Sequence, residues 1–216
     1  IFFFSDHGDY TGDFGIAEKS QNTFEDCLTN VPLLVKPPKG MPIDPGISDS
    51  LVELVDFYAT AMDYAGVKPS HDHFGRHLQP VLADRSVPFR DYAFCEGGRM
   101  PYEEQCDEYH ANGLSPQATG NAYWPRLTVQ LDPVAHAKGT MIRDQRYKYI
   151  RRVAGRDEFY DLQADPGERH NQIDNPAYAA EINELKLAML GWYQETCDVV
   201  PYDYDRRFAP EKIWGM

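Results

Sequence analysis

The sequence of 216 residues predicts an α/β fold that continues into a smaller antiparallel sheet with a packed helix. The apolar run of residues 1–4 is typical of a strand buried on both faces, and residues 31–35 form the next apolar strand. An amphipathic pattern that begins near residue 48 predicts a helix beside them. Later runs alternate between apolar and polar residues, as expected for antiparallel strands. We expect two domains, residues 1–90 and 91–216.

The composition limits the kinds of partner that the chain can have. It carries 21 basic and 34 acidic residues, which gives a formal net charge of −13. Nucleic acids and anionic membranes are bound by basic faces, so we expect neither nucleic acid nor membrane as a partner. An anionic substrate would need a local cation. No apolar run is long enough to span a bilayer.

The four cysteines, Cys27, Cys95, Cys106 and Cys197, are far apart and form no CxxC pair. This spacing favours free thiols over a disulfide framework, and it points to a reducing compartment such as the bacterial cytoplasm. The chain has no initiator methionine and begins within a predicted strand. We therefore expect it to be a C-terminal fragment.

The first apolar run ends abruptly at the polar residues 5–9, SDHGD. In open α/β sheets, ligands bind just beyond the carboxyl ends of the strands. Asp6 and His7 would lie at such an end, and both side chains can ligate a metal, although many such pairs are ordinary turn residues. Lys19 follows after a segment with several glycines, which could return its ammonium group to the same place. We predict a metal site here.

The elements that follow are expected in this order. Residues 23–28 could form a short helix with Thr23 as its N-cap. The next helix is expected to begin at residues 48–49 and to end at Gly66. Its core-facing stripe would consist of Leu51, Leu54, Val55, Tyr58, Met62 and Ala65. Residues 92–96 read as a further strand.

The C-terminal block has the clearest pattern. A hairpin is predicted over residues 139–151, followed by a strand at 158–162 and a turn at 165–171. Asn175 and Pro176 would open a helix that extends to about Thr196. The side chains expected on its buried side are Ile182, Leu185, Met189 and Trp192.

These motifs resemble the second half of a type I, formylglycine-dependent sulfatase, a family of the alkaline phosphatase superfamily. The family pattern is S-D-H-G-[ED]-x-x-G-x-H-G, then a lysine, an acidic pair and an apolar V-P-L strand. This sequence has the four parts in the same order: the S-D-H-G-D motif at residues 5–9, the lysine at Lys19, the acidic pair within residues 23–26, and the V-P-L strand within residues 30–34. Phe14 stands where the family has its second histidine, so a role of that histidine is not carried over.

The C-terminal block resembles the small subdomain of the same family, with its Y-K-Y-I, Y-D-L and D-P-x-E-x-x-N motifs. The resemblance implies an alkaline-phosphatase-like α/β/α sandwich, of which residues 1–90 form the C-terminal portion. Residues 91–216 would form the C-terminal subdomain, with scaffolding as the role of most of its motifs. Residues 97–125 would be a long substrate-side loop that shapes substrate choice. Residues 199–216 match no element.

Three histidines and an aspartate lie close together in residues 70–77 and could form a second metal cluster. In the resemblance, however, this segment is a surface turn before a short helix. We therefore do not expect His71 and His73 to be metal ligands.

The resemblance implies a reaction in which the hydrate of formylglycine attacks sulfur and the alcohol of a sulfate ester leaves. Asp6 and His7 would bind a divalent metal, Ca²⁺ by family habit, with Mg²⁺ or Mn²⁺ also suited to these ligands. Lys19 would be both a catalytic and a substrate-binding residue, paired with a sulfate oxygen. The surface alternative for Lys19 is an ion pair with Glu18 or Asp26.

The motif that yields formylglycine, C/S-x-P/A-x-R, does not occur in the sequence. The expected partners are therefore the missing N-terminal half of the same enzyme and a small-molecule or sugar sulfate ester, and we expect no activity from this chain alone. Two alternatives stay open: a phosphodiesterase or phosphonate monoester hydrolase of the same superfamily, and a non-catalytic module that retains the fold. Retention of Asp6, His7 and Lys19 together speaks against the second alternative.

Overall fold

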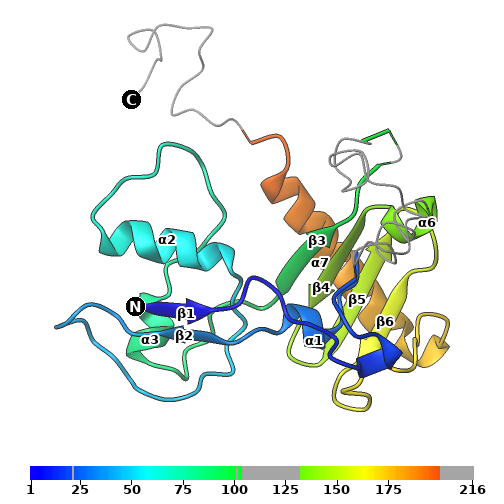
Figure 1. Cartoon of the computed structure of the whole chain (residues 1–216), viewed down its shortest axis with the longest axis horizontal. Helices are drawn as coiled ribbons and strands as arrows, with labels where there is room; N and C mark the ends of the chain where they lie inside the picture. Colours follow the sequence, from blue (N-terminus) through cyan, green and yellow to red (C-terminus); the bar gives the residue numbers. More distant parts are fainter. Residues whose placement is uncertain (21, 101, 104–131, 200–216) are drawn as a thin grey trace, which may run out of the picture. The chain divides into compact units, whose positions relative to one another are not determined.

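The computed structural model describes residues 1–20, 22–100, 102–103 and 132–199 (Figure 1). Most of the predicted loop at 97–125, and the tail from residue 200, lie outside the described residues. Within the described part, no helix combines the length and the apolar character that crossing a membrane requires. Two of the cysteines described there, Cys27 and Cys197, are free thiols.

The chain divides into two compact units. The first consists of Ile1, Lys36–Arg90 and the chain from Leu187 onwards, and the second consists of Phe2–Val35 and Asp91–Lys186. The units thus group the residues differently from the predicted domains at 1–90 and 91–216, which stay a prediction for the whole protein.

The second unit contains a four-stranded antiparallel sheet with the order β3-β4-β5-β6 (Figure 1). Its strands are β3 (Ala93–Gly97), β4 (Gly139–Arg143), β5 (Tyr147–Arg152) and β6 (Glu158–Asp161). The hairpin turn is held by Asp144, whose Oδ1 accepts hydrogen bonds from the backbone N–H groups of Arg146 and Tyr147, both at 2.6 Å. These strands confirm the predicted hairpin and the predicted strands on either side of it.

The part of a helix that belongs to the second unit, up to Lys186, contacts one face of this sheet. The helix α7 (Ala179–Thr196) follows a short 3-10 turn, η3 (Pro176–Tyr178), that Asn175 caps by accepting from the N–H of Ala177 at 3.0 Å. Ile182, Leu185 and Met189 are buried, which confirms most of the predicted stripe. The Lys186 Nζ lies 5.3 Å from the centre of the Tyr149 ring on β5.

The other face of the sheet packs against the segment that follows the predicted metal site. Phe24, Met141, Ile150 and Tyr160 form one buried cluster, with Cys95 and Leu162 packed against it. Because both faces are covered, successive side chains of β5 are buried: Lys148 is 0% exposed and Tyr149 is 1% exposed. This face joins the N-terminal segment to the C-terminal sheet.

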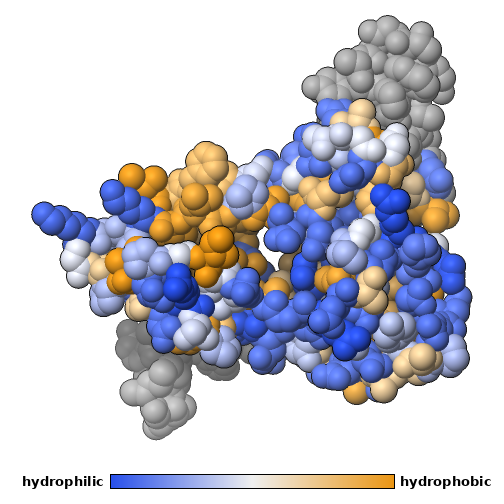
Figure 2. Space-filling model, turned by 90° about the horizontal axis from the view of Figure 1, so that it is seen from below, coloured by the Kyte–Doolittle hydropathy of each residue, from blue (hydrophilic) through white to orange (hydrophobic). Residues whose placement is uncertain are grey.

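The strands β1 (Phe2–Phe4) and β2 (Leu33–Val35) form a separate antiparallel pair. Phe3 pairs with Leu34, and these side chains are 66% and 58% exposed. The prediction that the first strand is buried on both faces is therefore wrong for the described residues, where this sheet has only two strands and one open face. Hydrophobic patches of this kind interrupt the hydrophilic surface in Figure 2.

The first unit contains α2 (Val55–Tyr64) and α3 (Gln79–Ala83). The helix α2 begins later than predicted, because Ser48 and Ser50 donate instead to the backbone carbonyls of Arg85 and Val87 at 2.9 Å. Gly66, with φ of +66°, ends the helix region as predicted.

The predicted apolar stripe of α2 is wrong, since its fully buried residues are Asp56, Ala59 and Thr60. The buried Asp56 carboxylate accepts hydrogen bonds from the Arg90 guanidinium and from the Arg76 N–H, the latter at 2.7 Å. A charged partner therefore replaces apolar packing on this face.

Candidate active-site loop

Asp6 and His7 lie directly after β1, at the position the sequence predicts. The Asp6 Oδ2 atom is 3.8 Å from the His7 Nε2 atom, and the side chains are 85% and 42% exposed, respectively. The Asp6 Oδ1 atom accepts from the His7 backbone N–H at 3.1 Å, and Ser5 donates its hydroxyl to the His7 carbonyl at 2.6 Å. The structure thus brings the carboxylate and the imidazole together on an accessible loop.

The imidazole of His7 is oriented by the backbone. Its Nδ1 atom lies 2.7 Å from the carbonyl oxygen of Gly8. Because a carbonyl oxygen only accepts, Nδ1 is the ring nitrogen that donates here, and in the neutral tautomer with this hydrogen bond Nε2 has the lone pair. Metal-binding histidines commonly have this arrangement, in which the second ring nitrogen donates to a carbonyl.

This donor pair fits a divalent metal, although it makes only part of a coordination shell. Across the described ranges, no group of three or more His, Cys, Asp or Glu side chains could hold a metal ion. A full site would therefore need further ligands beyond Asp6 and His7.

The loop is held tightly against α1 (Asp26–Thr29). The Gly8 N–H donates to the Leu28 carbonyl at 2.8 Å. A Cβ atom at Gly8 would lie 1.8 Å from the Cys27 carbonyl oxygen, so glycine alone permits this approach.

A second contact closes the same loop. Tyr10 is 1% exposed, and its hydroxyl donates to Glu25 Oε2 at 2.7 Å. Burial raises the pKa of Tyr10, so this phenol stays protonated and acts as a donor.

Lys19 lies farther along the loop and is half-buried. Among the described residues it makes no hydrogen bond or ion pair, and no contact joins it to Asp6 or His7. The surface alternative of a pair with Asp26 is not present, since Asp26 binds Lys148 and Arg143 instead.

The Asp26 cluster was missed in the sequence. We use this name for Asp26, Arg143, Lys148 and Glu168. The Lys148 Nζ atom lies 2.5 Å from Asp26 Oδ1, 2.6 Å from Glu168 Oε1 and 2.9 Å from the Phe24 carbonyl oxygen. The signal was present in the sequence, because Lys148 lies on the same face of β5 as the core residue Ile150, and a lysine at such a position needs buried acidic partners.

Glu168 and Arg143 complete the cluster. The backbone N–H of Asp26 donates to Glu168 Oε2 at 2.6 Å, and Arg143 Nη1 donates to both carboxylate oxygens of Asp26 at 2.8 and 2.9 Å. Thr23, the predicted cap, donates instead to the Ser20 carbonyl at 2.9 Å, so that prediction is wrong.

The two carboxylates of the cluster are shifted in opposite directions. Burial opposes ionisation of Asp26, but the Lys148 ammonium and then the Arg143 guanidinium outweigh it and lower the pKa of Asp26. Burial is the largest effect on Glu168 and raises its pKa, although Lys148 opposes the shift. Asp26 therefore stays ionised to a lower pH than Glu168 does.

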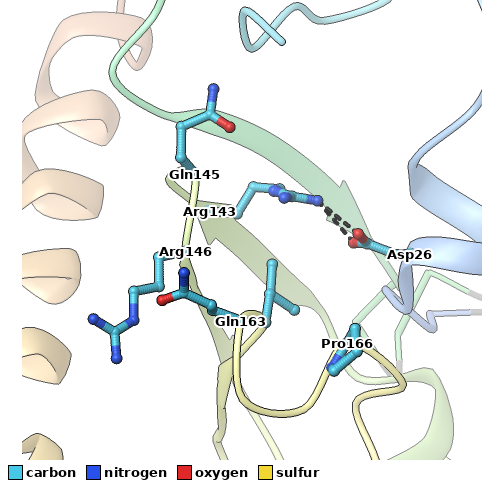
Figure 3. A pocket seen from close by; sticks show the side chains of 7 residues that line it. Asp26, Arg143, Gln145, Arg146, Gln163 and Pro166 are labelled. Carbon is cyan, nitrogen blue, oxygen red and sulfur yellow. Dashed lines mark hydrogen bonds and ion pairs between the residues drawn. The ribbon is translucent and has the colours of Figure 1, made fainter.

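One cavity of about 470 Å³ borders the cluster (Figure 3). It is lined by Asp26, Arg143, Gln145, Arg146, Leu162, Gln163 and Pro166. Figure 3 shows the Arg143 guanidinium directed at Asp26. The Arg146 guanidinium binds Asp161 at 2.7 Å. Both cations thus already have carboxylate partners.

The histidine segment lies in the first unit and meets aromatic rings. His71 stacks on Tyr58 with ring centres 5.5 Å apart, and His73 contacts the same ring edge-on at 5.3 Å. His77 lies 3.2 Å from the Asp63 carboxylate. The three imidazoles therefore do not share one set of partners.

Comparison with solved structures defines the class of fold. A sulfatase-like protein of Bacteroides thetaiotaomicron superposes with a TM-score of 0.66 at 24% identity, covering 95% of this chain and 39% of the other. A phosphonate monoester hydrolase of Agrobacterium radiobacter gives a TM-score of 0.64 at 26% identity, covering 90% of this chain and 35% of the other. The chain therefore has an alkaline-phosphatase-like α/β fold, as predicted.

Comparison of sequences also finds sulfatases among the relatives of this chain. An ulvan-active sulfatase of Formosa agariphila is 27% identical over 221 residues, covering 88% of this chain and 38% of the sulfatase. No family model matches the chain. The resemblance to sulfatases is confirmed: the chain is homologous to sulfatases, and also to phosphonate monoester hydrolases, of the alkaline phosphatase superfamily. It spans 38% of the length of that sulfatase, a share that is consistent with the predicted C-terminal portion.

Proposed function

We propose that this chain is the C-terminal half of a sulfatase that hydrolyses sulfate esters. The observation that carries the proposal is the Asp6–His7 pair, with Nδ1 fixed by the Gly8 carbonyl, in a chain homologous to sulfatases. The nucleophile, a formylglycine, and the remaining metal ligands would come from the N-terminal half of the same enzyme. A small-molecule or sugar sulfate ester is the expected substrate.

The residues of this chain would have two roles. Asp6 and His7 would hold a divalent metal, Ca²⁺ by preference, with Mg²⁺ or Mn²⁺ also compatible with an imidazole and a carboxylate. When bound, such an ion offsets negative charge on the sulfuryl oxygens and lowers the pKa of the nucleophile.

Lys19 would pair with a sulfate oxygen whose negative charge grows in the transition state. Its ammonium group has no partner among the described residues, so it could take an anionic group without first breaking an ion pair. In a chain with a net charge of −13, such a cation is the local exception that an anionic substrate needs.

A second candidate function is the hydrolysis of phosphonate monoesters or phosphodiesters. The similarity to the phosphonate monoester hydrolase of Agrobacterium radiobacter supports it. A metal-binding carboxylate and imidazole, together with a lysine, would serve either kind of tetrahedral anion. Comparing kcat/KM of the full-length protein on an aryl sulfate and on an aryl phosphonate ester separates the two: a preference for sulfate supports the proposal, and the reverse order supports the alternative.

The site assignment is tested by Asp6→Ala in the full-length protein. Removing an anionic ligand from a hard cation should lower Ca²⁺ affinity, measured by titration calorimetry, by 10-fold or more, and aryl sulfate turnover should fall with it. His71→Ala is the matched control and should change neither quantity, because His71 is exposed, stacks on the Tyr58 ring of α2 in the other unit, and is distant from Asp6 and His7 in the sequence. Equal losses in both variants would show that the metal site is assigned wrongly.

A further inference from the structure

We infer that Lys148 is a positioning residue for the Asp6–His7 loop, acting through α1. Its effect on turnover rests on the proposed function, whereas its effect on the loop does not. Lys148, the Asp26 cluster and the loop all belong to the second unit. The inference is carried by a continuous series of short contacts between them.

The first contact is a buried ion pair. The ammonium group of Lys148 is removed from solvent, with two carboxylates and the Phe24 carbonyl oxygen within 2.9 Å. The ammonium group donates to Asp26 Oδ1 and to the Phe24 carbonyl oxygen and forms an ion pair with Glu168, and these three contacts fix it in one position on β5. Because α1 begins at Asp26, this position also fixes the start of the helix.

The second contact fixes the orientation of the helix. The N-terminal backbone of α1 is capped from outside, since Glu168 accepts from the Asp26 N–H across 142 positions of sequence. Glu168 holds this place with a left-handed backbone, φ +52°. Glu168 also pairs with Lys148, so one lysine organises both the carboxylate and the cap of the same short helix.

The third contact reaches the loop. The helix α1 has four residues, and at its far end the Leu28 carbonyl accepts from the Gly8 N–H at 2.8 Å. Gly8 lies so close to the Cys27 backbone that a Cβ atom would not fit between the loop and the helix. The Gly8 carbonyl in turn orients the imidazole of His7. A shift of Asp26 would therefore move α1, and the hydrogen bond from Gly8 to Leu28 would pass that movement to the imidazole of His7.

The alternative is that Lys148 only stabilises the sheet. The two explanations differ in where the variant Lys148→Met disturbs the protein. A positioning role predicts faster amide hydrogen exchange in the peptide that contains Gly8, together with weaker metal binding. A stabilising role alone predicts a lower melting temperature without a selective change in the loop.

The experiment compares three variants of the full-length protein by hydrogen exchange, Ca²⁺ calorimetry and aryl sulfate kinetics, below the melting temperature of each. Lys148→Met should accelerate exchange of the Gly8 peptide by 10-fold or more, lower Ca²⁺ affinity by a similar factor, and reduce kcat more than it raises KM. Leu185→Ala removes a fully buried side chain on the opposite face of the sheet, and Arg146→Met breaks the Asp161 ion pair on the same hairpin. Both controls should leave the loop peptide and Ca²⁺ affinity unchanged.

Unchanged exchange and Ca²⁺ affinity in folded Lys148→Met would overturn the inference. If that variant does not fold, Asp26→Asn serves the same test, because it keeps the shape of the side chain while weakening the pull of Lys148. A third outcome separates the inference from the proposed function. If Lys148→Met accelerates exchange of the Gly8 peptide but the unmodified protein binds no Ca²⁺, the proposed function is refuted and the positioning role of Lys148 stands.

Discussion

The contact between Gly8 and α1 makes a sharp prediction for Gly8→Ala. A methyl group built at Gly8 would lie 1.8 Å from the Cys27 carbonyl oxygen and 2.8 Å from its carbonyl carbon. Both atoms belong to the backbone, so no side-chain rotation can relieve the overlap. The loop must move away from the helix by more than an ångström to reach an ordinary contact.

The size of the effect follows from what that movement breaks. The hydrogen bond from Gly8 to Leu28 is lost, which costs about 1 kcal/mol of net stability. Forcing the neighbouring backbone into a less favourable conformation costs about 1–3 kcal/mol more. We therefore expect Gly8→Ala to lower the free energy of unfolding of the full-length protein by about 2–4 kcal/mol. Ca²⁺ affinity should fall by more than 10-fold, because the Gly8 carbonyl no longer orients His7.

The matched control is Gly15→Ala in the same loop. Gly15 has φ of +74°, and a Cβ atom there would meet nothing within 4 Å. Alanine at that position should cost only the left-handed strain, about 1 kcal/mol, and should leave Ca²⁺ affinity unchanged. Urea denaturation and calorimetry of both variants provide the measurements. Equal destabilisation by the two substitutions, or normal Ca²⁺ binding by Gly8→Ala, would refute the steric reasoning.

Two further predictions concern charge. Lys19→Met should raise the barrier for aryl sulfate hydrolysis by about 2–4 kcal/mol, and Lys19→Arg should recover only part of that loss; near-normal kcat/KM in both variants would remove Lys19 from the site. The second prediction concerns Asp161, whose pKa the Arg146 guanidinium holds below its usual value through hydrogen bonds. A carboxyl with a lowered folded pKa contributes stability above the ordinary carboxyl pKa, and that contribution is lost as the pH falls through the lowered value. Asp161→Asn should therefore flatten the acid side of a melting temperature–pH curve below about pH 4, and an unchanged slope would contradict this account.

The elements that could be predicted from the sequence are those whose causes are local. Three such causes act within a few residues: the alternation over β4 and β5, the Asp144 carboxylate that accepts two backbone hydrogen bonds, and the Asn175–Pro176 start of the last helix. The SDHG motif located Asp6 and His7 for the same reason, since the pair and the backbone groups that hold it are sequence neighbours.

The errors arose where distant residues supply the partner. Asp56 is buried on α2 because Arg90, 34 positions away, binds its carboxylate. A helix cap was expected at Thr23, whereas the acceptor is Glu168. In the same way, the exposed Phe3 on β1 reflects the number of strands beside it, which a run of apolar residues does not encode.

The Asp26 cluster is better explained by the directed contacts that it makes than by its net contribution to the stability of the fold. Removing the Lys148 ammonium group and the Glu168 carboxylate from water costs several kcal/mol for each ion, and their mutual attraction returns little beyond that. Apolar residues of equal volume commonly stabilise a core at least as well. Apolar replacements at Lys148 and Asp26 would, however, lose the directed contacts that fix α1 against β5. The raised pKa of Glu168 shows that its burial is not fully compensated, yet this carboxylate occupies the one place from which it can cap Asp26. The cluster lies where the sheet meets the helix that contacts Gly8, so its directed contacts fit the positioning role inferred for Lys148.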